Sequence, residues 1–379
     1  NMKQNNYLLN LLKVTIFSFL LIATAPVRAE IKVVTTIKPL HSLVANVMDG
    51  IGEPGLIIDG SISPHSFTMK PSHAKMLEEA DVIFWIGEGI ETSMEGPLDS
   101  IAKGAEVIEF MELDSITKLK FREESIFGDH DDHDDHDDHD DHDDHDDHDD
   151  HDDHDDHDDH DDHDDHDDHD DHADHDDHDD HDDHAGHNHS GLDPHFFTDP
   201  LQMVEVVEAL VDFMIANVSG IDADQLRASG QSYVQQLQDL HNEIQELFEA
   251  VPFGKRVLVT NHEVFNYFAE QYDFEVVGTV IPSLSTTDSA SAKQLTELIE
   301  VIEKNNVPAI FADVASSDRL AAMIAEELGD IDVVNLYSES LGEAGSGAST
   351  YLDMLRTNYE RIATALAADD HDHDHDHDH

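Results

Sequence analysis

Short apolar runs alternate with longer amphipathic segments along most of the chain. The run at 31–37 (IKVVTTI) is rich in β-branched residues and almost unbroken, which predicts a strand buried on both faces. The next segment, 39–48, carries apolar residues at helical spacing and ends at Asp49 and Gly50. Repeated alternation of this kind is typical of βαβ units, so we expect an α/β fold with mainly parallel sheets.

The alternation occurs twice, which predicts two lobes that each have a small sheet and flanking helices. In the first lobe we predict strands at 31–37, 55–58, 81–86 and 106–108 and helices at 39–48 and 71–80. In the second lobe we predict strands at 256–260, 274–278, 309–311 and 332–335 and helices at 263–271, 292–304, 319–328 and 350–367. Ligands of open α/β sheets bind beyond the carboxyl ends of the strands, so we expect a site in a cleft between the lobes.

Two helical patterns precede the second lobe, one at 199–218 within the first lobe and one at 222–250 between the lobes. Asp222 or Asp224 can cap the second helix, and Pro252 ends it. At about 1.5 Å per residue this helix would span roughly 40 Å, which is long enough to join one lobe to the other.

The chain therefore divides into five segments. We predict a signal peptide at 1–29, an N-terminal α/β lobe at 30–221 with a disordered loop at 129–189, a linker helix at 222–250, a C-terminal α/β lobe at 251–368 and a disordered tail at 369–379. The first segment has positive charge at Lys3 and Lys13, a short apolar core at 14–25 and a small-x-Ala site ending at Ala29. We expect export to the periplasm with cleavage near Ala29, and a membrane anchor is the alternative.

Residues 129–189 consist almost entirely of the triplet His-Asp-Asp. This tract holds 36 aspartates and 21 of the 32 histidines, and the tail holds six aspartates and five histidines. The tract has almost no apolar residue to offset the entropy of ordering, so we expect it to be disordered. Flexible neighbouring His and Asp side chains can bind several zinc ions weakly. We consider metal gathering, buffering or docking of a zinc chaperone as roles, and a repeat expanded by slippage as the alternative.

Charge and cysteine content exclude several classes of protein. The net charge is −69, and without the aspartates of the tract and the tail it is −27. This strong negative charge argues against nucleic acid and anionic membranes as partners. The chain has no cysteine, so it has neither a disulfide framework nor a lipid on cysteine.

Six histidines lie outside the tract and the tail: His41, His65, His73, His195, His241 and His262. Four candidate ligands lie in predicted loops or just after predicted strands: His65 in SPHSF, His195 in LDPHF, His262 in TNHEV and Glu339 in YSES. Three imidazoles and one carboxylate can bind a four-coordinate divalent ion such as zinc. A single loop histidine beside a proline is more typical of a turn, so the combination carries the hypothesis.

Longer stretches around these residues carry a resemblance to a known family. They are TTIKPLHSLVANVMDG, SPHSFTMKPSHAKMLEEADVIFWIGEGIE, LDPHFFTDP, TNHEVFNYFAEQYDFEVVG and YSESLGEAGSGASTYLDMLRTNYERIATAL, and they spread over nearly all of 31–368. The chain resembles the periplasmic solute-binding proteins that deliver zinc or manganese to ABC importers, most of all the ZnuA type. That family also carries an acidic, His-rich insertion before its second histidine ligand, where this tract lies.

The resemblance implies a fold, a partner and a ligand set. It implies the metal-type periplasmic binding protein fold and an importer permease with its ATPase as partner. It implies that His65, His195 and His262 bind the metal, with Glu339 or a nearby acid as fourth ligand. A histidine at 262 resembles the zinc branch, because the manganese branch usually has a carboxylate there. Asp313 stands where many zinc-binding members have Glu, so Asp313 and water are the alternatives for the fourth position.

Other polar residues near the predicted strands have less specific roles. We expect His73 on a helix surface, His41 in packing or at the cleft lining, and His241 facing solvent. Glu91 follows the predicted strand 81–86 and either borders the cleft or caps a helix.

A closed shell of three histidines and Glu339 favours capture of zinc over catalysis, because zinc enzymes keep one position open. The chain has no HExxH or GxSxG motif. The leading hypothesis is a monomeric, high-affinity periplasmic zinc-binding protein that serves an ABC importer and is not an enzyme. The alternatives are a periplasmic metal buffer, a manganese-type binding protein and a zinc-dependent hydrolase.

Overall fold

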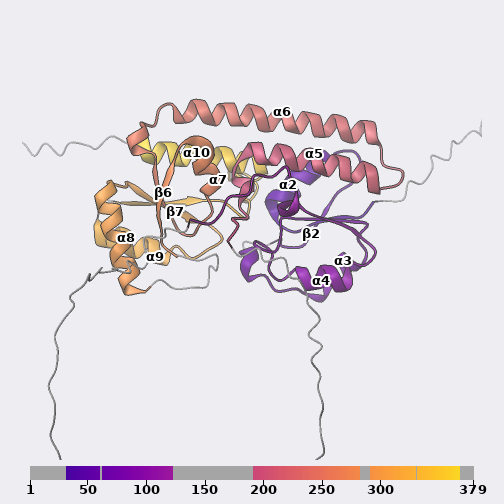
Figure 1. Cartoon of the computed structure of the whole chain (residues 1–379), viewed down its shortest axis with the longest axis horizontal. Helices are drawn as coiled ribbons and strands as arrows, with labels where there is room; N and C mark the ends of the chain where they lie inside the picture. Colours follow the sequence, from indigo (N-terminus) through magenta and orange to yellow (C-terminus); the bar gives the residue numbers. More distant parts are fainter. Residues whose placement is uncertain (1–30, 60–61, 123–190, 282–290, 330, 368–379) are drawn as a thin grey trace, which may run out of the picture. The chain divides into compact units, whose positions relative to one another are not determined.

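The computed structural model describes residues 31–59, 62–122, 191–281, 291–329 and 331–367 (Figure 1). The predicted signal peptide at 1–29, the His-Asp tract at 129–189 and the tail at 369–379 lie outside the described residues. Among the described helices, none combines the length and the apolar character that a membrane span requires.

The first sheet has four parallel strands in the order β2-β1-β3-β4. They are β1 (Val33–Thr35), β2 (Gly55–Leu56), β3 (Val82–Trp85) and β4 (Glu106–Glu109). Every residue of the two central strands, β1 and β3, is buried. Burial on both faces explains why their sequences are almost continuously apolar and do not alternate.

Three α-helices accompany this sheet: α2 (Lys38–Val47), α3 (Pro71–Glu78) and α4 (Glu95–Ile101). Helices α2 and α3 have a proline in the first turn, where the missing amide hydrogen has no helical partner to lose. Helix α4 was not predicted, because it is short, contains Gly96 and Pro97, and buries only Leu98. A 3-10 turn, η2 (Phe110–Glu112), follows β4.

The second sheet repeats this design with the strand order β6-β5-β7-β8, again all parallel. Its strands are β5 (Val257–Thr260), β6 (Glu275–Thr279), β7 (Ala309–Asp313) and β8 (Asp332–Leu336), and its helices are α7 (Asn266–Tyr272), α8 (Ala292–Asn305) and α9 (Arg319–Leu328). A 3-10 turn, η4 (Phe253–Lys255), precedes β5. Two parallel sheets with flanking helices confirm the predicted fold class.

Helix α7 begins at Asn266, three residues later than the predicted start at 263. The residues before it form a loop that is hydrogen-bonded to the sheet. The Thr260 hydroxyl donates to the His262 carbonyl at 2.9 Å, and the Asn261 amide donates to the Phe311 carbonyl at 2.8 Å. These bonds hold residues 260–262 in a loop next to the sheet. Helix α7 therefore begins only after the loop that carries His262.

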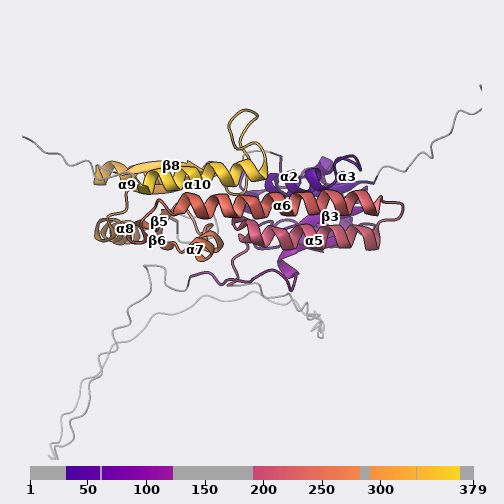
Figure 2. The ribbon, with the colours of Figure 1, turned by 90° about the horizontal axis from the view of Figure 1, so that it is seen from above.

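Two long antiparallel helices, α5 (Pro200–Asn217) and α6 (Ala223–Phe248), pack against each other. Asp222 caps α6 by accepting from the Gln225 amide at 3.1 Å, which decides between the two predicted caps. Helix α6 contacts α2 of the first lobe and α10 (Tyr351–Ala367), which follows the second sheet. In two perpendicular views α6 runs beside α5 at one end and α10 at the other (Figures 1 and 2).

Helix α10 forms a second connection between the lobes. It packs against β7 and β8 of the second sheet and also against α2 of the first lobe. Its first residue, Tyr351, donates its amide to the Ser42 hydroxyl at 3.0 Å. The largest apolar core is continuous across both lobes, and a smaller cluster that includes Val259, Ile310 and Ile324 lies within the second lobe.

Candidate metal site

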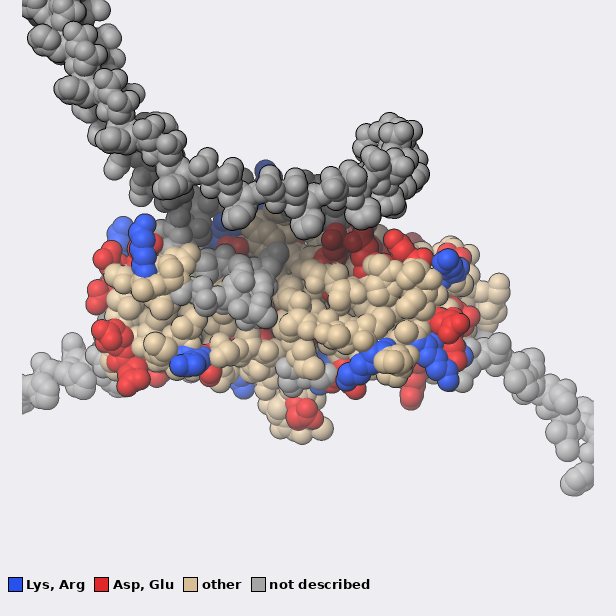
Figure 3. Space-filling view, turned by 90° about the horizontal axis from the view of Figure 1, so that it is seen from below, with Lys and Arg blue, Asp and Glu red and all other residues tan. Residues whose placement is uncertain are grey.

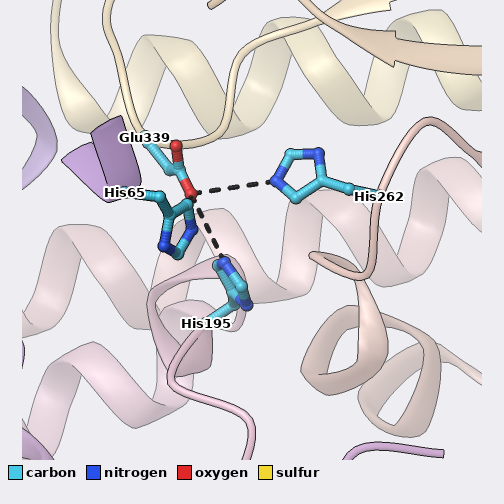
Figure 4. A group of neighbouring side chains, drawn as sticks. All are labelled: His65, His195, His262 and Glu339. Carbon is cyan, nitrogen blue, oxygen red and sulfur yellow. Dashed lines mark ion pairs between the residues drawn. The ribbon is translucent and has the colours of Figure 1, made fainter. Parts of the chain in front are cut away.

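The four predicted ligands come from four separate loops and converge on one point (Figure 4). His65 lies in the 3-10 turn η1 (Pro64–Ser66) after β2, and His195 directly precedes the turn η3 (Phe196–Thr198). His262 lies two residues after β5, and Glu339 lies three residues after β8. One candidate ligand atom from each residue lies within 4.8 Å of all the others.

Local hydrogen bonds hold each loop in place. The Ser66 hydroxyl and amide both donate to the Ser63 carbonyl, which closes the turn around His65. Ser63 also donates its hydroxyl to Glu339 Oε2 at 3.0 Å, so the His65 turn and the Glu339 loop contact each other directly. The other carboxylate oxygen, Oε1, faces the three histidines.

Glu339 Oε1 lies 2.7 Å from His65 Nε2, 3.5 Å from His195 Nε2 and 3.8 Å from His262 Nε2. All four atoms are buried, and none makes a contact with hydrogen-bond geometry, even at 2.7 Å. Zinc bonds of about 2.0–2.1 Å in a tetrahedron place ligand atoms roughly 3.3 Å apart, which falls inside this range. Four buried ligand atoms without a hydrogen bond are costly by themselves, and a divalent cation would satisfy all of them.

At Glu339 and at His195, burial and the neighbouring charged groups shift the pKa in opposite directions. Burial by itself would raise the pKa of Glu339, but His195, His262 and His65 together hold this pKa well below its usual range. Burial by itself would lower the pKa of His195, but Asp193 and Glu339 raise it to about 9. Without a metal ion, a proton on His195 therefore balances the carboxylate, and a bound cation must displace it.

Asp313, the predicted alternative for the fourth position, lies near the site but is not part of the group. Its Oδ1 accepts from the Ala315 amide at 2.6 Å, and its Oδ2 accepts from the Ser338 hydroxyl. Burial and the charge of Glu339 raise its pKa. Both carboxylate oxygens are occupied by protein donors, so Asp313 is poorly placed to bind an ion here.

The remaining histidines lie apart from the group. The Lys70 amide donates to His73 Nδ1 at 3.2 Å, so His73 caps α3, and its half-buried ring lies 5.1 Å from the ring of Phe67. His41 Nε2 lies 3.0 Å from the Pro54 carbonyl and is half-buried. His241 does not simply face solvent: it is half-buried, and its Nδ1 lies 3.1 Å from the Tyr272 hydroxyl. The ring of Tyr272, which contacts both His241 and Phe248 of α6, accounts for this difference.

Glu91 is fully buried and does not border a cleft. Its carboxylate accepts from the Gly87 amide at 3.0 Å, from the Ile86 amide at 3.3 Å and from the Thr36 hydroxyl. It therefore fixes the loop after β3. Burial raises its pKa to about 7.

Three residues that sequence reasoning missed support His195. Asp193 Oδ1 lies 2.8 Å from His195 Nδ1, and Asn266 and Tyr267 contact Asp193 from α7. The short spacing in LDPH is a signal for the Asp193–His195 pair, because an Asp often accepts from the backbone amide two residues on, as Asp193 does at 2.9 Å. No local pattern points to Asn266 or Tyr267, which are more than 70 residues away from Asp193.

Comparisons with known proteins show which family the chain matches. Residues 33–365 match the family model described as ZnuA, zinc-uptake complex component A, periplasmic. The high-affinity zinc uptake system protein ZnuA of Paracoccus denitrificans is 32% identical over 352 residues, which is 92% of this chain and 95% of that protein. The protein of the same description from Brucella abortus is 48% identical over 99 residues, 26% of this chain and only 30% of that relative's length.

A solved structure shares the fold. The periplasmic zinc-binding protein TroA from Treponema pallidum superimposes with a TM-score of 0.66 at 23% identity, over 90% of this chain and 100% of that chain. At this level of identity the likeness concerns the fold alone. The family model covers most of the chain, so the chain belongs to the ZnuA family of periplasmic zinc-uptake components.

Proposed function

We propose that the chain captures one Zn²⁺ at His65, His195, His262 and Glu339 and delivers it to the permease and ATPase of an ABC importer. The observation that carries the proposal is the convergence of four buried ligand atoms that have no hydrogen-bond partner. Membership of a zinc-uptake family supports the importer as partner.

Capture fits the geometry better than catalysis. The side chain of His65 is 6% exposed and the other three are at most 1% exposed. A catalytic zinc keeps one position for water or substrate, whereas four protein ligands close the shell. The chain therefore acts as a binding protein and not as a hydrolase.

The ligand set favours zinc over manganese. Imidazole nitrogen and four-coordination suit zinc, whereas manganese prefers more oxygen ligands. The protein surface helps to attract either cation, because Asp and Glu far outnumber Lys and Arg in the chain. On the face seen in Figure 3, acidic side chains gather near the margins among scattered basic ones.

The proposal extends to the segments outside the described residues. The mature protein is a periplasmic monomer whose signal peptide is cleaved near Ala29. The tract at 129–189 and the tail at 369–379 are accessory segments that gather metal weakly, and a zinc chaperone is a candidate partner for them. Neither segment is needed for the tight site.

A variant that lacks 129–189 tests the site separately from the tract. We expect it to bind one zinc ion per chain tightly in competition with a chelator of known affinity. Loss of one ligand in His262→Ala should weaken zinc binding by about 100-fold or more, since even supporting residues contribute 10–100-fold. His73→Ala is the matched control and should bind zinc like the parent. If the parent deletion variant loses tight binding, the tract is the main site and the proposal is wrong.

The fourth ligand is tested in the same deletion variant. Glu339→Gln should lose zinc affinity as strongly as His262→Ala, whereas Asp313→Asn should keep one tight zinc ion per chain. The reverse result would move the fourth position to Asp313. A preference for Mn²⁺ over Zn²⁺ in direct competition would replace zinc as the transported ion.

A further inference from the structure

Helix α7 reaches from the second lobe to the segment that carries His195. Its first residue, Asn266, donates its Nδ2 to Asp193 Oδ2 at 2.8 Å. Its second residue, Tyr267, donates its hydroxyl to the Asp193 carbonyl at 3.0 Å. Asp193 is 0% exposed, and Asn266 and Tyr267 are buried as well. Two adjacent side chains of α7 therefore bind one buried aspartate, at its side chain and at its backbone.

Asp193 in turn orients His195. Its Oδ1 accepts from the His195 amide at 2.9 Å and lies 2.8 Å from His195 Nδ1. With Nδ1 directed at Asp193, Nε2 faces Glu339 Oε1 at 3.5 Å. His195 occupies Asp193 Oδ1, so Asn266 supplies the donor for the other oxygen. A buried carboxylate oxygen without that donor would be strongly destabilised, and the orientation of Asp193 would be less firmly fixed.

The Tyr267 hydroxyl connects two backbone segments, one at Asp193 and one at Leu119. Besides donating to Asp193, its hydroxyl accepts from the Leu119 amide at 3.0 Å. The Asp193 amide donates to the Leu119 carbonyl at 2.9 Å, so the two backbone segments also pair with each other. Burial raises the pKa of Tyr267, which keeps its hydroxyl protonated as a donor. The segment before His195 is thus held against α7 without any contribution from a metal.

We propose that Asn266 and Tyr267 are positioning residues of the zinc site: acting through Asp193 across the two lobes, they hold His195 in its metal-binding orientation. The proposal rests on the proposed function, because it concerns the same site. His262 lies in the loop that leads into α7, so one helix start fixes two of the three histidines. Half of the ligand set is assembled before zinc arrives.

A double-mutant cycle tests whether Asn266 acts through Asp193. We expect Asn266→Leu to weaken zinc binding about 10–100-fold, the range for residues that orient a ligating histidine. In the Asp193→Ala background, Asn266→Leu should cause little further loss of zinc affinity, because the carboxylate oxygen to which Asn266 donates is absent. Zinc affinity is measured by chelator competition, and thermal unfolding of each zinc-free variant shows whether it folds. Asn266→Ser is the second variant if Asn266→Leu does not fold.

A matched pair on the same helix tests Tyr267. Tyr267→Phe should weaken zinc binding, whereas Tyr272→Phe, which loses only a contact to His241, should not. Wild-type affinity in Asn266→Leu, or equal losses with and without Asp193, would overturn the inference. The proposed function would still hold after that result, provided that the variant lacking 129–189 binds zinc and that His262→Ala in this variant does not. If the parent itself fails to bind zinc, the proposed function fails instead.

Discussion

At the residue scale, two buried carboxylates near the site have opposite electrostatic environments. Taken as whole residues, Glu339 and Asp313 are 4% and 5% exposed, so both lose hydration to a similar degree. Three imidazoles face Glu339 and lower its pKa, while the charge of Glu339 and burial raise the pKa of Asp313. The neighbours of each carboxylate, and not its burial, decide which one is available as an anionic ligand.

Glu91 is a third buried carboxylate, and it does not belong to the group of four candidate ligands. Burial raises its pKa from 4.5 to about 7, against the hydrogen bonds from Thr36, Gly87 and Ile86. Between these two pH values the folded protein holds a proton that the unfolded chain has released. The folded state is therefore favoured below pH 4.5, and this contribution is lost as the pH rises towards 7.

Replacing Glu91 should remove this pH dependence. We expect the free energy of unfolding of the wild type, relative to Glu91→Gln, to fall by at most about 3 kcal/mol between pH 4.5 and pH 8. Urea unfolding of the zinc-free proteins at several pH values measures the difference. Glu95→Gln, at an exposed position, is the control and should follow the wild type. Parallel curves for the wild type and Glu91→Gln would show that Glu91 is ionised throughout.

At the scale of elements, close helix packing depends on a single glycine. Gly230 of α6 faces α5, and a Cβ atom at this position would lie 2.7 Å from Val211 Cγ2. This distance is too short for a van der Waals contact, so the two helices can approach only because residue 230 has no side chain. Gly96 of α4 has no neighbour of this kind within 4 Å.

The two helical glycines should respond in opposite directions to alanine. Gly230→Ala should lower the free energy of unfolding by about 1–3 kcal/mol, the usual effect of overpacking. Gly96→Ala should raise it by roughly 0.5–1 kcal/mol, because alanine restricts the unfolded chain. Thermal or urea unfolding measures both changes. Val211→Ala should restore part of the stability of Gly230→Ala, and no rescue would mean that the clash lies elsewhere.

Helix α10 also contributes to the site from a distance. The Tyr351 hydroxyl donates to the Phe197 carbonyl at 2.6 Å, and the Tyr359 hydroxyl donates to the Thr198 carbonyl. Both acceptors lie in η3, the turn that directly follows His195. Helices α7 and α10 thus hold the two sides of the His195 segment.

At the scale of the whole described molecule, three features resist a wide hinge motion. Helix α6 contacts both lobes, α10 does the same, and the largest apolar core continues from one lobe to the other. Opening the lobes by a large angle would expose parts of this core to water, which is costly. Binding and release of zinc should therefore involve small shifts of loops and packed helices.

Two labels can measure this motion, because the chain has no cysteine that would compete for them. We introduce Lys103→Cys in the first lobe and Lys304→Cys in the second, both at exposed positions. Spin-label distances with and without zinc should differ by about 2 Å, the scale of shear between packed helices. A swing of many ångströms would contradict the prediction and show that α6 bends or that α10 detaches.

Most elements of the fold could be predicted, because local patterns specify them. Buried strands such as β3 need continuous apolar sequence, and the helices that pack on them need apolar residues at helical spacing. The start of α7 and the short helix α4 could not be predicted. Hydrogen bonds next to the sheet fix the start of α7. Helix α4 buries only Leu98, so it has no apolar pattern that could predict it.

The candidate site was predicted in part, and the limit has a physical cause. The sequence by itself determined the two α/β lobes, the connecting helix and the residue types that can bind zinc, since each of these depends on local spacing and side-chain chemistry. Only the tertiary structure brought the ligand atoms of His65, His195, His262 and Glu339 within 4.8 Å of one another. It also placed the Ala315 amide and the Ser338 hydroxyl where they donate to Asp313. The contacts of Asn266 and Tyr267 with Asp193 also required it, because chain folding, and not sequence spacing, places residues more than 70 positions apart within hydrogen-bond distance.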